Sequence, residues 1–248
     1  MEHVIGFFGG DSQTGTTMTA WSFAERLSAK GRRVLLIFGS GGDDQAVIPM
    51  ENGRSIDDLK AFLRSGRVER EELFQCLEKK KELWMLHGTK NSLTAEYFME
   101  DTFQILLADV ELDFDDVVID GGSDIRLGLT VSALNLCSDR FFVLTQQAKS
   151  LHRYMRRKQY FFDPLGFRGQ VIVNRYRKDP ALFLKKDLCR ILGTEDVYVI
   201  PLVENGWQAE LEQKNLLGAP RFAKAIEDLT AYYVDEEKKV KRWKRPFI

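Results

Sequence analysis

A buried strand, a glycine-rich turn, a helix and a second buried strand follow one another at the start of the chain. Residues 4–9 form the first apolar run, and residues 33–38 form the second. Between them, residues 16–29 carry apolar side chains at helical spacing, and Gly31 interrupts that pattern just before the second strand. A strand, a helix and a strand in this order predict the opening unit of a parallel sheet.

The turn between the first strand and the helix has the frame G-x-x-x-x-G-x-[ST] of a phosphate-binding loop. Its two glycines allow backbone N–H groups to point inward, and the helix N-terminus adds partial positive charge. A tight turn without a ligand is the alternative interpretation of the two glycines. The predicted nucleotide-binding positions of the loop are Gly10, Asp11, Ser12, Gln13, Thr14, Gly15, Thr16 and Thr17.

Two positions of this loop decide what chemistry it supports. Thr17 stands where a Ser or Thr reaches Mg²⁺, whereas Thr16 stands where a lysine normally contacts the β- and γ-phosphates. The sequence therefore predicts the backbone of a nucleotide site without its main cation.

Strands and helices alternate along the rest of the chain, without a linker or a detectable repeat. Further strands are predicted at 83–87, 115–120, 140–144, 170–174 and 197–201, and helices at 55–64, 68–80, 93–112, 127–137, 148–160, 180–192, 207–217 and from about 220 onward. This order predicts a single domain over residues 1–248, an α/β fold with a doubly wound, mostly parallel sheet flanked by helices. Ligands bind at the carboxyl ends of such strands, where Gly10, Gly39, Asp120 and Asn174 would lie.

Composition argues against several kinds of protein. The formal net charge is −1, so the overall balance does not favour nucleic-acid binding. Three cysteines and three histidines are scattered along the chain, which argues against a metal site made of protein ligands alone. No secretory signal and no apolar run of membrane-spanning length is recognisable, so we expect a reduced, cytoplasmic protein.

The order of elements resembles the MinD/ParA family of dimerising P-loop ATPases, also called the deviant Walker A family, over nearly the whole chain. The resemblance is carried by the loop, by residues 114–120 with their terminal carboxylate, by 171–176 and by 199–201. It implies a P-loop NTPase-like fold that binds ATP or ADP with Mg²⁺. It also implies a homodimer in which the nucleotide-loop edge faces the partner.

Individual site residues follow from the same resemblance. Thr17 and Asp120 match the family's metal-binding threonine and its Walker B-like aspartate, so both are predicted metal-site residues. Asn174 matches the asparagine that reads adenine. A turn or capping role is the alternative for Asp120 and Asn174.

The sequence also departs from the family pattern. The family loop reads G-K-G-G-V-G-K-T-T, and here Asp11 and Thr16 replace the two lysines. The D-x-D motif has become Phe38-Gly39-Ser40, and D-T-P has become Asp120-Gly121-Gly122. Loss of one cation in phosphoryl transfer costs roughly 10³-fold in rate, so hydrolysis is expected to be weak or absent. Asp11 is either a solvated loop residue or a partner for a lysine or arginine across an interface.

The resemblance favours a spatial-organising or assembly scaffold, with protein partners in a pilus or other envelope machine. Flp/Tad pilus proteins of the TadZ/CpaE type also have atypical nucleotide loops. The alternatives are a slow ATPase that cycles on membrane or DNA, and a nucleotide-free protein-interaction module. The basic segment 236–248 is expected either to contact the inner face of the membrane peripherally or to be a solvated helix end. The helix carrying His152, Arg153, Arg156, Arg157 and Lys158 offers a second basic face, for which DNA is a weaker expectation than solvent.

Overall fold

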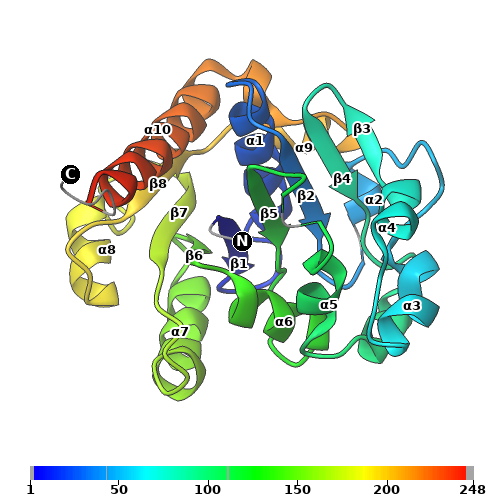
Figure 1. Ribbon diagram of the computed structural model, residues 1–248. Helices are drawn as coiled ribbons and strands as arrows, with labels where there is room; N and C mark the ends of the chain where they lie inside the picture. Colours follow the sequence, from blue (N-terminus) through cyan, green and yellow to red (C-terminus); the bar gives the residue numbers. More distant parts are fainter. Residues whose placement is uncertain (1–2, 43, 111, 244–248) are drawn as a thin grey trace.

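A computed structural model describes residues 3–42, 44–110 and 112–243, with side chains as far as residue 234 (Figure 1). The strands are β1 (Val4–Gly9), β2 (Val34–Phe38), β3 (Glu78–Lys80), β4 (Leu83–Leu86), β5 (Asp116–Asp120), β6 (Asp139–Thr145), β7 (Gln170–Tyr176) and β8 (Tyr198–Pro201). The α-helices are α1 (Thr16–Ser28), α2 (Asp44–Val47), α3 (Lys60–Arg64), α4 (Arg70–Cys76), α5 (Thr102–Leu107), α6 (Gly128–Leu136), α7 (Ala148–Arg157), α8 (Lys185–Leu192), α9 (Gly206–Leu211) and α10 (Pro220–Trp243). Shorter helical turns are η1 (Ile56–Leu59), η2 (Ser92–Tyr97), η3 (Lys158–Phe162) and η4 (Leu216–Gly218).

The eight strands form one sheet in the order β3-β4-β2-β5-β1-β6-β7-β8. Every neighbouring pair is parallel except β3 with β4. Strands β1, β2 and β5 are buried along their whole length, which explains their continuous apolar runs. The prediction of a doubly wound, mostly parallel sheet is confirmed.

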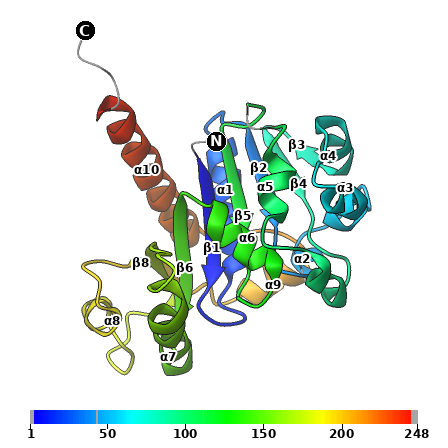
Figure 2. The ribbon, with the colours of Figure 1, turned by 60° about the horizontal axis from the view of Figure 1, so that its bottom comes forward.

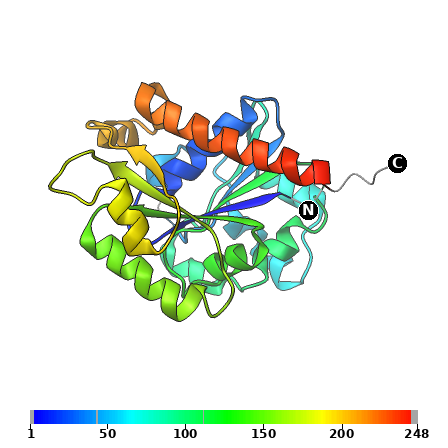
Figure 3. The same ribbon diagram turned by 90° about the vertical axis from the view of Figure 1, so that its left-hand side faces the viewer.

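Helices cover both faces of the sheet. Helices α1 and α10 lie on one face and α7 lies on the other (Figure 3), and α7 and α8 flank the β6–β8 end while α3 and α4 flank the β3–β4 end (Figure 2). Alternation along β1 divides the core accordingly, because Ile5 and Phe7 pack in the α1/α10 cluster whereas Val4 and Phe8 pack in the opposite cluster.

Four predicted helices are wrong in part. The helix predicted near 180–192 begins only at Lys185, and the predicted helix 207–217 divides into α9 and η4. Residues 68–80 were expected to be one helix, but α4 ends at Cys76 and residues 78–80 pair antiparallel with β4. The Lys79 ammonium lies 4.1 Å from the ring centroid of Trp84, and this cross-strand contact stabilises the extended form. Residues 93–112 divide into η2 and α5. Thr102, the first residue of α5, accepts the N–H of Met99 through Oγ1 at 3.0 Å, and this hydrogen bond fixes the turn between the two helices.

The C-terminal helix α10 packs against α1 and β8 through its first half. The basic character predicted for 236–248 depends on side chains outside the described residues. Among the described residues, no helix combines the length and the apolar character needed to cross a membrane.

Candidate functional site

The predicted site residues meet at the carboxyl edge of the sheet, where β1 lies between β5 and β6. The N–H of Gly9 donates to Gly122 O at 2.7 Å, and the N–H of Gly10 donates to Val143 O at 2.9 Å. The turn after β1 is therefore fixed from both sides by its neighbouring strands. Asp120 is the last residue of β5 and Asn174 lies near the end of β7, so both lie at the same edge of the sheet, as the sequence predicted.

Gly15 adopts the left-handed conformation, with φ of 83°, directly before the first residue of α1. A Cβ at this position would lie 2.3 Å from Asn174 Nδ2, so the loop requires glycine there. Of the other loop positions, Ser12 and Gln13 are exposed and Thr14 is buried. Glycine at position 15 therefore allows both the left-handed turn and the close approach of Asn174 on β7 to the loop.

Asn174 is used to hold the loop. Its Nδ2 donates to Thr14 O at 2.8 Å, and its Oδ1 accepts the N–H of Arg175 at 2.8 Å. The side chain is almost entirely buried. Recognition of adenine by Asn174 remains a prediction, and it would require this amide to exchange its present partners.

The two predicted metal-site residues, Thr17 and Asp120, are in contact at one end of the loop, which we call the metal end. Thr17 Oγ1 donates to Asp120 Oδ2 at 2.5 Å, and Gly122 N–H donates to Asp120 Oδ1 at 3.2 Å. Burial raises the pKa of Asp120 to about 6, against the effect of these two hydrogen bonds, and the nearby Asp44 carboxylate adds to the rise. A hydroxyl and a carboxylate are hard oxygen ligands of the kind Mg²⁺ prefers. The residues present fit this ion.

The opposite end of the loop is organised around Asp11, which is 7% exposed. Its Oδ1 accepts the N–H of Ser12 at 2.7 Å and a hydrogen bond from Arg153 Nη1 on α7. Burial alone would raise the pKa of Asp11, but Arg153 and the Ser12 N–H hold it below its usual value. The interpretation of Asp11 as a solvated loop residue is wrong, because its carboxylate is buried and pairs with Arg153 of the same chain. A partner for Asp11 across an interface stays a prediction.

Thr16 does not reach outward as the lysine of a phosphate loop would. Its Oγ1 lies 3.1 Å from Thr14 Oγ1, and the residue is 8% exposed. The two hydroxyls satisfy one another inside the turn. No cation stands at this position of the loop itself.

A second arginine of α7 also reaches the loop. Arg157 Nη1 donates to Gly9 O at 3.0 Å and to Gly10 O at 3.1 Å. Burial lowers the pKa of Arg157, although the Asp11 and Asp124 carboxylates oppose that effect. Two of the five residues on the predicted basic face, Arg153 and Arg157, therefore contact the loop.

Solved structures with the same architecture are found, although no protein-family model matches the chain and a search of curated proteins gives no match. A ParA family ATPase from Chlorobium tepidum TLS superposes with a TM-score of 0.79 at 18% identity, over 93% of this chain and 99% of that chain. MinD of Pyrococcus horikoshii OT3, complexed with Mg-ADP, gives 0.79 at 17% identity, over 97% and 99%. MinD in the MinC:MinD complex of Aquifex aeolicus gives 0.76 at 20% identity, over 94% and 96%.

The chain has the ParA/MinD fold. The resemblance inferred from the order of elements is thereby confirmed at the level of the fold, over nearly the whole chain.

A buried cluster of two carboxylates and one imidazole lies beside the metal end and was not predicted from the sequence. His87 Nδ1 lies 3.0 Å from Asp44 Oδ2, and His87 Nε2 lies 3.5 Å from Glu78 Oε2. All three residues are at most 9% exposed. Asp44 lies close enough to Asp120 to raise its pKa, so the segment after β2 brings an acidic group to the site although Phe38-Gly39-Ser40 has none.

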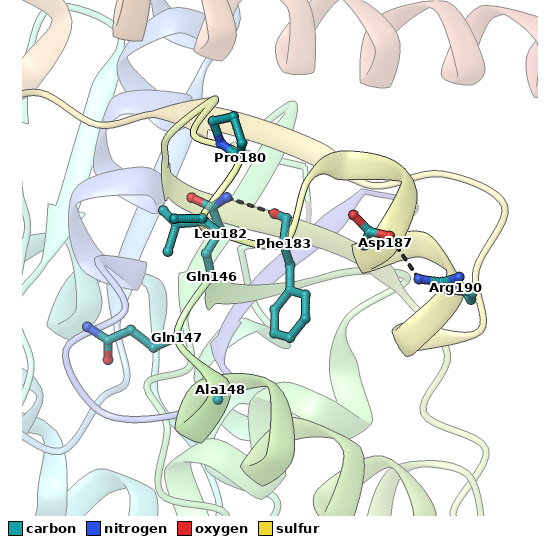
Figure 4. Close-up of a pocket in the computed structure, with 9 residues that line it drawn as sticks. Gln146, Gln147, Ala148, Pro180, Leu182, Phe183, Asp187 and Arg190 are labelled. Atoms are coloured by element: carbon teal, nitrogen blue, oxygen red, sulfur yellow. Dashed lines mark hydrogen bonds and ion pairs between the residues drawn. The ribbon is translucent and has the colours of Figure 1, made fainter.

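A cavity of about 520 Å³ opens at the ends of β6 and β7 (Figure 4). Gln146 forms its inner wall, and its Nε2 donates to Arg177 O at 3.0 Å and to Phe183 O at 2.8 Å. Ala148 of α7 and Asp187 and Arg190 of α8 also line it, and none of the loop residues 10–17 does. The candidate nucleotide site and this cavity are lined by different residues.

Proposed function

We propose that this chain binds ATP or ADP with Mg²⁺ through the loop 10–17 and hydrolyses ATP slowly or not at all. The observation that supports the proposal is the contact between Thr17 and Asp120, because two side-chain oxygens of the kind that bind Mg²⁺ lie together at the helix N-terminus of the loop. The lysine positions hold Thr16 and Asp11, so the phosphoryl group would lack the two loop lysines that stabilise its transfer in the family pattern.

The biological role we propose is a spatial-organising or assembly scaffold, with nucleotide binding used as a switch. Support for this role comes from the fold, since ParA and MinD structures are similar to it, and from the loss of both loop lysines. We further propose a homodimer that meets at the loop edge, with partners in a pilus or other envelope machine. Peripheral contact with the inner face of the membrane would involve segment 236–248, which lies largely outside the described side chains.

A second candidate is a protein-interaction module that binds no nucleotide. The observation in its favour is that Asp11 places a buried carboxylate inside the loop, where it occupies the Ser12 N–H. A phosphate entering the loop would be repelled by this charge.

Calorimetric titration of Mg-ATP into the protein distinguishes the two candidates. The nucleotide proposal predicts micromolar binding that is lost in Thr17→Ala and retained in Thr17→Ser, because the serine keeps the hydroxyl. Sedimentation of the same samples reports whether ATP shifts the chain to a dimer. Absence of binding in the wild-type protein at millimolar ATP would contradict the proposal and favour the interaction module.

A further inference from the structure

Two arginines on α7 supply positive charge to a loop that has none of its own. Arg153 and Arg157 are four residues apart on one helix and therefore share a face. Arg157 binds the carbonyl oxygens of Gly9 and Gly10, while Arg153 binds the carboxylate of Asp11. Helix α7, which follows β6, therefore supplies the positive charge beside the loop.

The two arginine side chains differ in how firmly they are held in place. Arg157 is partly buried and its guanidinium is anchored by two backbone oxygens. The side chain of Arg153 is 46% exposed, and its ion pair with Asp11 is one that rotation about its flexible side chain can break. Arg153 is therefore the arginine that is able to change partners without disturbing the turn.

Asp11 occupies the donors that an anionic ligand would need. Its Oδ1 accepts one backbone N–H of the loop, from Ser12, and one guanidinium, from Arg153. Backbone N–H groups and arginine are the usual donors to phosphate in proteins. The carboxylate is almost entirely buried and stays ionised, since its pKa lies below the usual value.

We propose that Asp11 acts as an internal anion of the loop when no nucleotide is bound, and that a nucleotide phosphate displaces it and binds Arg153. This inference rests on the proposed nucleotide binding and adds to it a residue that no loop motif contains. Displacement has a cost, because the buried Asp11 must find another partner or turn to solvent. The loop would therefore bind nucleotide more weakly than Arg153 alone would allow, and only a ligand with sufficient negative charge would compete.

A double-mutant cycle on Asp11 and Arg153 tests this exchange, with Mg-ATP affinity measured by calorimetry at low ionic strength. Asp11→Asn is expected to bind about tenfold more tightly, because it removes the competing carboxylate and frees the arginine. Arg153→Gln is expected to bind at least about tenfold more weakly. Arg156→Gln, an exposed arginine on the same helix outside the loop contacts, is the matched control and should leave the affinity unchanged.

The double variant decides whether Arg153 contacts phosphate or merely neutralises Asp11. If Arg153 contacts phosphate, Asp11→Asn/Arg153→Gln binds about tenfold more weakly than Asp11→Asn. Equal affinity of these two variants would overturn the proposal. Melting temperatures confirm that each variant folds, and Arg153→Met, which keeps a long side chain without the charge, replaces Arg153→Gln if the glutamine variant does not fold.

Failure of this inference is distinguishable from failure of the proposed function. Wild-type binding that is unaltered in all three variants would overturn the role of Arg153 and leave nucleotide binding intact. Binding that appears only in Asp11→Asn and is lost again in the double variant would support the exchange and contradict nucleotide binding by the natural chain. Absence of binding in every variant would contradict both.

Discussion

The two ends of the phosphate loop obtain their functional groups in different ways. At the metal end, Thr17 and Asp120 come from two recognisable sequence motifs and meet at 2.5 Å. At the other end, the charges come from Asp11 and from Arg153, which lies 142 positions further along the chain. The first arrangement is set by the strand–loop–helix unit and its neighbour strand. The second depends on how α7 packs, and a change in that helix can alter one end of the loop without altering the other.

Gly15→Ala is expected to disturb both ends of the loop and to cause the largest loss of stability among these substitutions. The left-handed backbone and the 2.3 Å approach to Asn174 Nδ2 together predict a loss of about 3 to 4 kcal/mol in the free energy of unfolding. Gly31→Ala is the control, since its φ is also positive but no atom lies within 4 Å of the added Cβ, and about 1 kcal/mol is expected. Urea denaturation measures both, and equal losses would show that the contact with β7 does not constrain the loop.

Asp120→Asn tests the metal end through its pH dependence. The pKa of Asp120 is about 6 in the folded protein, above its ordinary value of 3.8, so the folded state binds more protons than the unfolded state between these values. Stability in the absence of metal therefore falls as the pH rises from about 4 to above 6, by about 3 kcal/mol for this group.

The asparagine variant lacks this titration. Its stability relative to the wild-type protein should increase by about the same 3 kcal/mol between pH 4 and pH 7.5, as measured by urea denaturation in EDTA. Mg²⁺ should offset part of the wild-type loss at pH 7.5, because it binds the ionised carboxylate. A difference between the two proteins that does not change with pH would contradict the assignment of Asp120 as a buried, destabilised carboxylate.

Arg157→Gln tests the other end and should have a smaller effect. It removes the two charge-assisted hydrogen bonds to Gly9 O and Gly10 O, and a loss of about 2 kcal/mol in the free energy of unfolding is expected. Arg156→Gln, at an exposed position, should cost less than about 0.5 kcal/mol. If both substitutions cost the same small amount, α7 does not stabilise the loop through its arginine.

Most of the fold could be predicted from the sequence because continuous apolar runs mark strands that are buried on both faces. The edge strand β3 was missed, because a three-residue strand with two exposed lysines carries no such signal. The contact between Thr17 and Asp120 was predictable, since Thr17 lies in the first turn of the helix after β1 and Asp120 ends the strand adjacent to β1.

The contacts of Arg153 and Arg157 could not be predicted in the same way. Arginines at helical spacing indicate a basic face, but they do not indicate which loop that face meets. The cluster of Asp44, His87 and Glu78 was missed for a related reason, because its members come from three separate elements and form no motif along the chain. The signal available was that His87 directly follows a buried strand, at the edge where ligands bind.

The most direct test of the difference between the two ends is the fate of bound ATP. The protein is saturated with Mg-ATP and incubated for hours, and the recovered nucleotide is identified, with Asp120→Ala as the control for hydrolysis unrelated to the site. Retention of the metal end without loop lysines predicts that ATP is recovered intact, with no more phosphate released than in the control. Conversion of bound ATP to ADP in the wild-type protein, abolished in Asp120→Ala, would contradict the account and show that this site hydrolyses ATP without loop lysines.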